Sequence, residues 1–305
     1  MRGDLMVRRP DEASDEEWAA RIRPNTKALY SESIPNPLGQ VTDLERLARI
    51  AHAHGLPFVV DNTCATPYLE RPIEFGADVV IHSTSKWLAG HGAVIGGAVV
   101  DAGRFDWAAS GRFPQLSEAP RPGLGSFVER FGAGALGAYL RSVIVLEYGA
   151  TVPPTSTFLL LHGIETLSLR MERHVANAQA VAEFLDARPE VPVVHYPGLP
   201  SSPYAELARK YLPAGAGSIV TIDLGSRAAA RAFIDALELT TPMTHIGDVR
   251  TLALHLGSTI HLKLSEEQRL AIGITPGLVR LSIGIESARD IIADLERGLA
   301  AVAAL

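Results

Sequence analysis

Residues 57–63 read Pro-Phe-Val-Val-Asp-Asn-Thr, and residues 77–87 read Ala-Asp-Val-Val-Ile-His-Ser-Thr-Ser-Lys-Trp. Each segment is a short apolar run, rich in β-branched residues, that ends in polar residues. Such runs are typical of buried parallel strands, and ligands of open α/β sheets bind beyond the carboxyl ends of those strands. We therefore expect neighbouring strands to carry Asp61 and Lys86 to the same edge of one sheet.

A lysine and an aspartate at one sheet edge, with several hydroxyl groups, suit the chemistry of pyridoxal 5'-phosphate (PLP). The amine forms a Schiff base with the cofactor, the carboxylate keeps the pyridine nitrogen protonated, and hydroxyl groups bind the phosphate. Taken singly, a lysine after a strand is usually solvated, and an aspartate there usually caps the next helix. The grouping of Lys86 with Ser83, Ser85 and the turn at 90–92 favours the functional interpretation.

Composition limits the class of protein. With 305 residues, of which 47% are hydrophobic, the chain can bury a large core in one or two domains. The net charge is −6 and the basic residues are scattered, which argues against nucleic acid or an anionic membrane as a partner.

A single cysteine, Cys64, excludes an internal disulfide, fits a reducing compartment and is best interpreted as a small apolar filler. Residues 1–10 lack the apolar core of a signal peptide, so we expect a cytoplasmic protein without membrane spans or a metal site.

Periodicity predicts repeated βαβ units in the first half of the chain. Strands are expected at 27–32, 57–60, 77–81 and 93–101, with a helix over 43–54 that closes at Gly55. Ser14 and Glu17 have the spacing of a capping box for an earlier short helix. Residues 104–149 are rich in Gly, Pro and aromatics without a clear period, which we interpret as a long active-site insertion with some helix.

The second half predicts a smaller α+β unit. A helix is expected over 157–185, with a break or kink at Gly163. It is followed by predicted strands at 191–196, 218–224 and 278–284 and by predicted helices at 226–237 and 287–302. We place the two domains at 1–164 and 165–305.

From about Pro24 onward the chain resembles the PLP-dependent enzymes of Cys/Met metabolism, the transsulfuration family of the aspartate-aminotransferase fold. Within this family it is most similar to the O-acetylhomoserine sulfhydrylases (aminocarboxypropyltransferases). Eight blocks carry the resemblance, in chain order: Val60-Asp61-Asn62-Thr63, residues 81–87, Gly90-His91-Gly92, residues 165–171, His195-Tyr196-Pro197-Gly198-Leu199-Pro200, residues 247–252, residues 264–268 and residues 279–286.

The resemblance assigns a role to each matching residue that contacts the cofactor. It implies that Lys86 forms the Schiff base with PLP and that Asp61 pairs with the pyridinium nitrogen. Asn36, in the family's Glu-x-x-x-Asn pattern, is implied to bind the phenolic oxygen of the ring. Ser83 and Ser85 are implied to bind the phosphate.

The resemblance also implies how substrate binds. Arg280 would hold the α-carboxylate of the substrate in a bidentate manner, with Thr251 where relatives often have serine. The ordinary alternative for Arg280 is a salt bridge, but an arginine within an apolar strand needs a demanding partner. Leu256, where relatives commonly have proline, and residues 152–156 depart from the family pattern near the substrate.

The implied activity is a PLP-dependent transferase reaction of transsulfuration and methionine biosynthesis. Sulfide or a thiol would replace the acyl group of O-acetylhomoserine or another O-acylhomoserine, which gives homocysteine or methionine. Alternatives are a cystathionine γ-synthase or γ-lyase of the same family, a non-catalytic remnant with weak PLP binding, and a generic Schiff-base aldolase, which does not require Asp61. Family members are commonly homotetramers, so a homo-oligomer is implied.

One family feature is not found in this sequence. The family's large domain opens with a segment that carries a Gly-containing phosphate loop, an aromatic residue that stacks on the cofactor ring and an arm that reaches a neighbouring subunit. Residues 1–24 contain no Gly-rich loop, and their only aromatic residue is Trp18. We therefore expect a truncated, mainly parallel large-domain sheet with a smaller α+β C-terminal domain.

Overall fold

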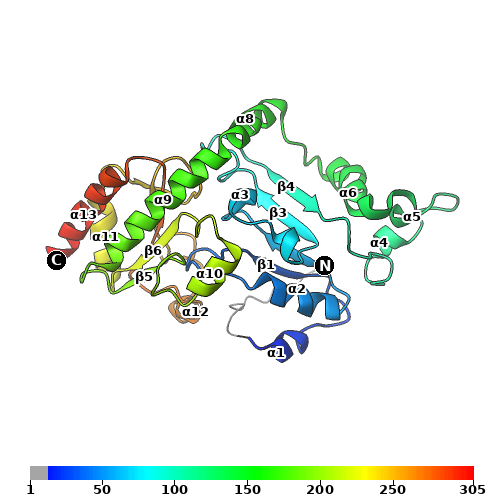
Figure 1. Ribbon diagram of the computed structural model, residues 1–305, viewed down its shortest axis with the longest axis horizontal. Helices are drawn as coiled ribbons and strands as arrows, with labels where there is room; N and C mark the ends of the chain where they lie inside the picture. The colour runs from blue at the N-terminus through cyan, green and yellow to red at the C-terminus, as the bar shows by residue number, and fades with distance from the viewer. Residues whose placement is uncertain (1–12) are drawn as a thin grey trace.

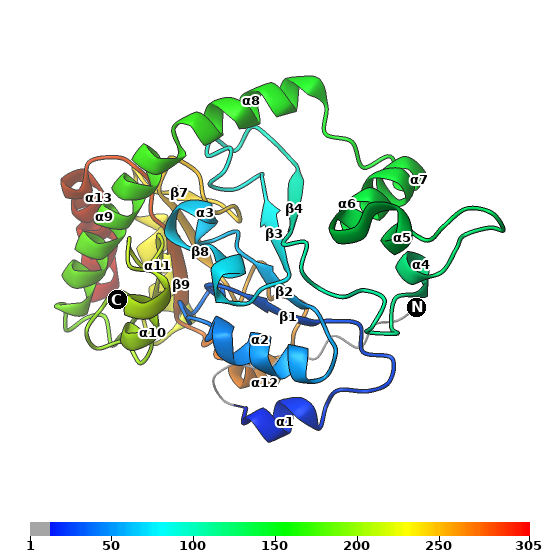
Figure 2. The same ribbon diagram turned by 45° about the vertical axis from the view of Figure 1, so that its right-hand side comes forward.

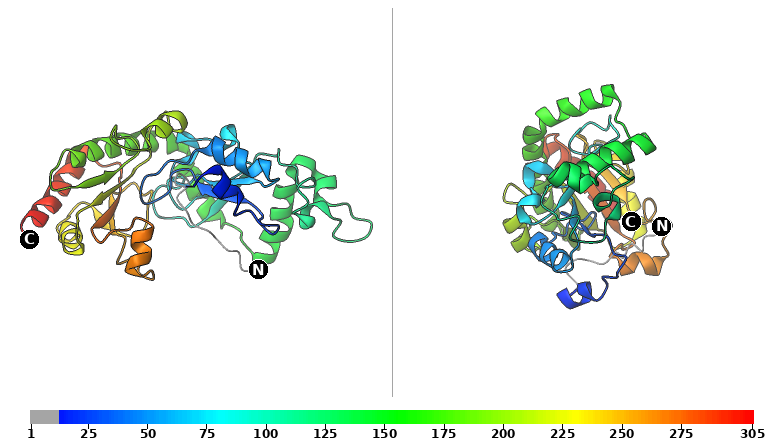
Figure 3. Two further views of the ribbon diagram at one scale, coloured as in Figure 1. Left: turned by 90° about the horizontal axis from the view of Figure 1, so that it is seen from below. Right: turned by 90° about the vertical axis from the view of Figure 1, so that its right-hand side faces the viewer.

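The computed structural model describes residues 13–305, so the prediction about residues 1–10 lies outside the described part. Two sheets organise the chain (Figure 1). The first has four strands in the order β1-β2-β3-β4, and the second has five in the order β5-β6-β9-β8-β7. The parts that contain the two sheets lie end to end, with α13 at one end and the helices α4–α7 at the other (Figure 3). The prediction of two sheet-bearing units is confirmed.

The elements of the first half begin with a short capped helix. In chain order they are α1 (Asp15–Ala19), β1 (Leu29–Glu32), α2 (Leu44–Ala53), β2 (Phe58–Asp61), α3 (Thr66–Leu69), η1 (Pro72–Phe75), β3 (Val79–Ser83), β4 (Gly97–Asp101), α4 (Pro114–Ser117), α5 (Phe127–Phe131), η2 (Gly132–Gly134), α6 (Ala135–Tyr139), η3 (Leu140–Val145) and α7 (Leu146–Tyr148). The capping box of Ser14 and Glu17 is present at the start of α1, as predicted.

The first sheet is parallel except at one edge. Strands β1, β2 and β3 run parallel, with Leu29 beside Phe58 and Val59 beside Val79. Strand β4 joins β3 in the antiparallel sense, so the expected mainly parallel sheet is confirmed with a reversed edge strand. The crossover from β1 to β2 contains α2, whose first turn is capped by the Asp43 carboxylate.

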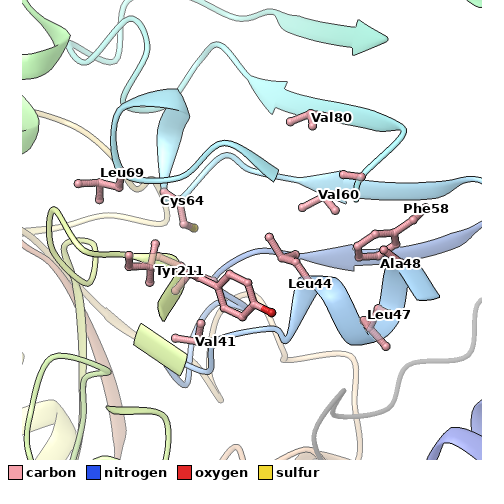
Figure 4. Close-up of a cluster of buried hydrophobic side chains, with 14 of the residues drawn as sticks. Val41, Leu44, Leu47, Ala48, Phe58, Val60, Cys64, Leu69, Val80 and Tyr211 are labelled. Atoms are coloured by element: carbon pink, nitrogen blue, oxygen red, sulfur yellow. The ribbon is translucent and has the colours of Figure 1, made fainter. Parts of the chain in front are cut away.

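A hydrophobic core lies between α2 and this sheet. The helix buries Leu44, Leu47 and Ala48, which face Phe58 and Val60 of β2 (Figure 4). These positions follow the helical period, and burial of each leucine stabilises the fold by roughly 1.5–3 kcal/mol. The core thereby fixes the direction of β2 and the position of its last residue, Asp61.

Residues 104–149 form short helices around an aromatic cluster. Trp107 lies between Phe105 and Phe113, with ring centroids 4.8 and 4.9 Å apart. The cluster packs against Val79 of β3. These helices lie beyond β4, on the side away from the second sheet (Figure 2). The segment has a small core of its own, and its place at the active site stays a prediction.

The helix expected over 157–185 is two helices, α8 (Pro154–Glu165) and α9 (Leu167–Asp186). The predicted break at Gly163 is wrong, because α8 continues through this residue and ends at Glu165, with Thr166 as its C-cap. Gly163 has another role: a Cβ there would lie 2.5 Å from the carbonyl oxygens of Leu88 and Ala89. The glycine lets α8 approach the loop that follows β3. The break at Thr166 lies near the expected domain boundary at 164/165, which stays a prediction.

The second half contains β5 (Val193–His195), α10 (Ala205–Tyr211), β6 (Ile219–Asp223), α11 (Arg227–Asp235), β7 (Thr241–Pro242), β8 (Leu252–His255), α12 (Glu266–Ala271), β9 (Leu278–Ser282) and α13 (Ala288–Ala303). The predicted strands at β5, β6 and β9 and the predicted helices at α11 and α13 are present. The short elements α10, β7, β8 and α12 were not predicted. None of the helices within 13–305 is long and apolar enough to cross a membrane.

Candidate functional site

The ends of β2 and β3 bring Asp61 and Lys86 to the same edge of the first sheet. The strands are parallel, with Asp61 beside Ile81, and Lys86 lies in the turn that follows β3. The backbone nitrogen of Ser83 donates to Oγ1 of Thr63 at 2.8 Å, which ties the two strand ends together. The predicted placement of both residues at one edge is confirmed.

Asp61 is held in place but carries no ion pair with any residue that the structure describes. Oδ1 accepts from the backbone nitrogen of Thr63 at 2.9 Å, and Oδ2 lies 3.4 Å from the hydroxyl of Tyr30. Among residues 13–305 no lysine, arginine or histidine lies within salt-bridge distance of this carboxylate. A fixed carboxylate without a cationic partner is suited to an external N–H cation such as a pyridinium.

Lys86 is half-buried, and its amine lies against an imidazole. Nζ is 3.0 Å from Nδ1 of His245, a residue on the loop between β7 and β8. Burial lowers the pKa of the Lys86 amine, and the nearby charge of Arg280 lowers it further. The lowered pKa increases the fraction of neutral amine, which is the form that acts as a nucleophile or a base.

The two serines predicted for phosphate binding differ in their surroundings. The Ser85 hydroxyl accepts from the backbone nitrogen of Gly96 at 3.0 Å and is therefore partly occupied by the start of β4. The Ser83 hydroxyl has no hydrogen-bond partner in the described part of the chain. Ser83 is the last residue of β3 and Ser85 follows it, both within three residues of Lys86, so the site gathers hydroxyl groups as expected.

Arg280 on β9 is a buried cation without an anionic partner in the described part of the chain. It is 2% exposed, and no carboxylate within 13–305 forms a salt bridge with it. Nη2 donates to the backbone oxygens of Thr244 and His245, Nη1 lies 3.5 Å from Oδ1 of Asn36, and Nε has no partner. Burial lowers the pKa of the guanidinium to about 10. A desolvated arginine with an unused donor indicates a site for an external carboxylate or other anion.

Asn36 is fixed next to Arg280. Its backbone nitrogen donates to Oε2 of Glu32 at 3.2 Å, as the Glu-x-x-x-Asn spacing permits. Its side-chain oxygen faces the guanidinium of Arg280. Through Asn36 and Arg280, the loop after β1 thus contacts strand β9 of the second sheet.

Thr251 lies apart from this group of side chains. Its hydroxyl donates to Oε2 of Glu286 at 2.8 Å and accepts from the nitrogen of Gly284 at 2.9 Å. Both hydrogen-bonding functions of the hydroxyl are therefore used within the second domain, and the side chain is fully buried. A role in substrate binding stays a prediction.

The thiol of Cys64 is buried near several charged groups of the site. The charges of Glu32, Asp61, Arg280 and Lys86 all act on it, and burial raises its pKa, which keeps it protonated. The residue belongs to the hydrophobic core, so the prediction of a buried apolar filler is confirmed.

The sequence did not reveal His245. The residue lies 159 positions from Lys86, on an irregular loop, so neither periodicity nor spacing connects the two side chains. The loop with His245, the turn with Lys86 and strand β9 with Arg280 come together where the second domain packs against the first. A separate surface hollow of about 250 Å³ lies near α12, lined by residues such as Arg227, His255 and Arg269, and contains no predicted site residue.

The residues present fit PLP. Lys86 supplies an amine with a lowered pKa; within residues 13–305, Asp61 supplies a fixed carboxylate without a counter-ion and Ser83 a hydroxyl without a partner. Arg280 supplies the unpaired donor that an amino-acid carboxylate would occupy. This set matches the groups that PLP chemistry on amino acids requires.

Comparison with known proteins agrees with this geometry. The sequence is 46% identical over 286 residues to the homocysteine synthase of Schizosaccharomyces pombe, an alignment that covers 92% of this chain and 66% of that protein. It is 42% identical over 293 residues to O-acetyl-L-homoserine sulfhydrylase 1 of Thermus thermophilus, covering 95% of this chain and 69% of the relative. The chain spans about two thirds of the length of the curated relatives it matches.

Solved structures confirm the predicted PLP-dependent transferase fold. A Campylobacter jejuni protein solved with N'-pyridoxyl-lysine-5'-monophosphate has a TM-score of 0.88 and 34% identity, covering 93% of this chain and 68% of that one. Cystathionine gamma synthase from Xanthomonas oryzae has a TM-score of 0.77 and 36% identity, covering 95% and 67%. The family model for Cys/Met metabolism PLP-dependent enzymes matches residues 1–300. The chain therefore belongs to the Cys/Met metabolism PLP-dependent enzyme family.

Proposed function

We propose that the chain carries out PLP-dependent γ-replacement on an O-acylhomoserine, with sulfide or a small thiol as the incoming group. The observation that supports this most strongly is the buried Arg280, which has no anionic partner within residues 13–305 and lies close enough to Lys86 for its charge to act on the amine. Relatives named homocysteine synthase and O-acetyl-L-homoserine sulfhydrylase, at 46% and 42% identity, point to the same reaction.

Each site residue has a defined task in this reaction. When bound, PLP supplies an electron sink that stabilises negative charge on the carbon next to the substrate amino group. Asp61 holds the pyridine N–H, Asn36 and Ser83 hold other polar atoms of the cofactor, and Arg280 binds the substrate carboxylate. Lys86 holds the cofactor through its amine and, once released, carries protons at Nζ between substrate carbons.

The bond changes balance with acetate as the leaving group. The Cγ–O bond of O-acetylhomoserine breaks, a Cγ–S bond forms to sulfide, and acetate leaves, so homocysteine is the product. With methanethiol as the incoming group, the product is methionine. No external oxidant or reductant is needed.

The proposal is tested by a product assay. The chain, supplied with PLP, O-acetylhomoserine and sulfide, is expected to release acetate and homocysteine in equal amounts. Arg280→Lys keeps a positive charge but removes the forked donor, so KM for O-acetylhomoserine is expected to rise at least tenfold. Absence of acetate release by the PLP-supplied wild-type chain would contradict the proposal.

A lyase or synthase is the second candidate, favoured by the similar folds of a cystathionine gamma-lyase and a cystathionine gamma synthase, both with a TM-score of 0.77. A γ-lyase would release acetate at the same rate without sulfide. A γ-synthase would prefer cysteine to sulfide as the incoming thiol. The same assay with sulfide, with cysteine and with neither separates the three activities.

We propose that the working form is a cytoplasmic homo-oligomer. Large apolar side chains are exposed on α7 and α8, among them Leu146, Tyr148, Phe158 and Leu161, the first two of them more than three quarters exposed. An oligomer would cover this surface. Light scattering after size exclusion is expected to give one defined mass, whereas an alternative non-catalytic remnant would form aggregates that grow with concentration.

A further inference from the structure

The imidazole of His245 is the side chain that contacts the Lys86 amine. Nδ1 lies 3.0 Å from Nζ, a normal hydrogen-bond distance. The loop that carries the histidine is fixed from the other side, because Nη2 of Arg280 donates to the His245 carbonyl oxygen at 3.2 Å. The contact is therefore set by the packing of the second sheet against the turn after β3.

The geometry defines which nitrogen of the ring holds a proton. An ammonium at Lys86 is a donor only, so Nδ1 must accept and the neutral ring carries its hydrogen on Nε2. Nε2 is buried without a partner at bonding distance, while the Ser85 backbone lies close enough to favour the protonated ring. The ring thus has one nitrogen directed at Lys86 and a second that can hold the proton of the neutral form.

The charges around the pair disfavour two protonated groups side by side. Burial lowers the pKa of both His245 and Lys86. Arg280 on β9 lowers both further, and Lys86 lowers that of His245, whereas Asp248 raises it and Cys64 raises that of Lys86. Two bases that repel each other when both are charged titrate as a coupled pair. The state with a proton on both groups is accordingly disfavoured.

We propose that His245 is the proton-exchange partner of Lys86: Nδ1 takes a proton directly from Nζ when a neutral amine is required and returns it afterwards. In the forward step an N–H bond at Nζ breaks, an N–H bond at Nδ1 forms, and the positive charge moves to the ring, where it is favoured by Asp248, a carboxylate that is itself paired with Arg250. The use of the amine rests on the proposed function, whereas the contact between Nζ and Nδ1 stands on the geometry alone.

The first test measures the protonation of Lys86 without cofactor. Acetic anhydride labels neutral amines, so the extent of labelling from pH 6 to 11, read by peptide mass spectrometry, gives a midpoint for each lysine. The chain has four lysines, and exposed Lys263 is the internal reference. His245→Ala removes the acceptor and is expected to lower the midpoint of Lys86. His245→Asn retains an acceptor oxygen and is expected to restore it.

The second test measures proton exchange through the rate at which the apo chain captures PLP, followed by absorbance. We expect capture at pH 7 to slow at least tenfold in both His245→Ala and His245→Asn, because neither side chain takes up a proton. Added imidazole should restore the rate of His245→Ala but not of Lys86→Ala. His162→Ala, an exposed histidine on α8, is the matched control and should behave as the wild type.

The outcomes separate the inference from the proposed function. Equal Lys86 midpoints in the wild type and His245→Ala would overturn the contact. Capture by His245→Asn at the wild-type rate, or no response of His245→Ala to imidazole, would overturn proton exchange while leaving the γ-replacement proposal intact. A wild-type chain that captures no PLP would instead contradict the proposed function, and the labelling comparison would still decide whether His245 holds Lys86.

Discussion

Arg170 on α9 donates from Nη1 to the backbone oxygen of Trp87 at 2.7 Å. The same guanidinium reaches the backbone oxygens of Leu88 and Gly163 through Nη2 at 3.3 and 2.5 Å. A buried arginine of the helix that leads into the second domain thus fixes the turn that carries Lys86. Burial lowers the pKa of this guanidinium, which nevertheless remains charged.

Removal of this guanidinium is expected to destabilise the fold. Arg170→Leu keeps much of the volume but leaves three buried carbonyl oxygens without their donor, at a cost of roughly 2–4 kcal/mol in the free energy of unfolding. Arg173→Leu changes an exposed arginine on the same helix and is the control, with an expected change within about 0.5 kcal/mol. Urea denaturation measures both, and equal midpoints for the two variants would contradict the assigned role.

Gly247 allows the second domain to approach Trp87. A Cβ at this position would lie 2.7 Å from the backbone nitrogen and ring of Trp87, and the residue has a φ of +76°. Gly225 has nearly the same φ, +78°, but open space around it. The two glycines therefore separate the cost of backbone conformation from the cost of a steric clash.

Alanine at these two positions should have different effects. Gly225→Ala carries the conformational cost alone, roughly 1–2 kcal/mol, while Gly247→Ala adds a clash of roughly 1–3 kcal/mol. Because the clash displaces the residue next to Lys86, Gly247→Ala should also slow PLP capture. Thermal unfolding and capture rates measure the two effects, and a Gly247→Ala variant no less stable than Gly225→Ala would show that this close approach is absent.

Glu70 is a buried carboxyl group whose side-chain oxygens have no hydrogen-bond partner within residues 13–305. Burial raises the pKa of the Glu70 carboxyl group to about 8, and the nearby Ser33 hydroxyl lowers it by a smaller amount. The folded chain therefore keeps this proton between about pH 4.5 and 8, where the unfolded chain has lost it. It follows that the free energy of unfolding falls as the pH rises through this window.

Replacement of Glu70 by glutamine should remove that pH dependence. Glu70→Gln is expected to be more stable than the wild type at pH 8 by roughly 2 kcal/mol or more, and the difference should shrink toward pH 5. Glu74→Gln, at an exposed position four residues away, should follow the wild type at every pH. Parallel urea curves from pH 5 to 8 measure this, and a constant difference between wild type and Glu70→Gln would contradict a buried neutral carboxyl.

The sequence predicted the sheet edge because local signals define it. The runs before Asp61 and before Ser83 are short, apolar and β-branched, and the helix of Leu44 and Leu47 has a clear period, so a parallel unit follows. Contacts between segments that are distant in the sequence leave no such local signal. His245 meets Lys86, and Arg170 meets Trp87, only because the second domain packs on the first.

Other differences from the prediction have local causes. A glycine within a helix predicts a break, but α8 continues through Gly163. The glycine is needed there because a Cβ would clash with the Leu88–Ala89 backbone. Strand β8 (Leu252–His255) was not predicted because it has only four residues. Thr251, placed near the substrate by family resemblance, has its hydroxyl on Glu286, a partner 35 residues away that spacing does not reveal.

The central claim is that Lys86 is the amine that bonds PLP. The measurement is incubation of the full chain with one equivalent of PLP, reduction with borohydride, and peptide mass spectrometry of the four lysines at 27, 86, 210 and 263. The account predicts a pyridoxyl group on Lys86 in most molecules and little on the other three. An even distribution over all four lysines, or a chain that retains no pyridoxyl group, would contradict it.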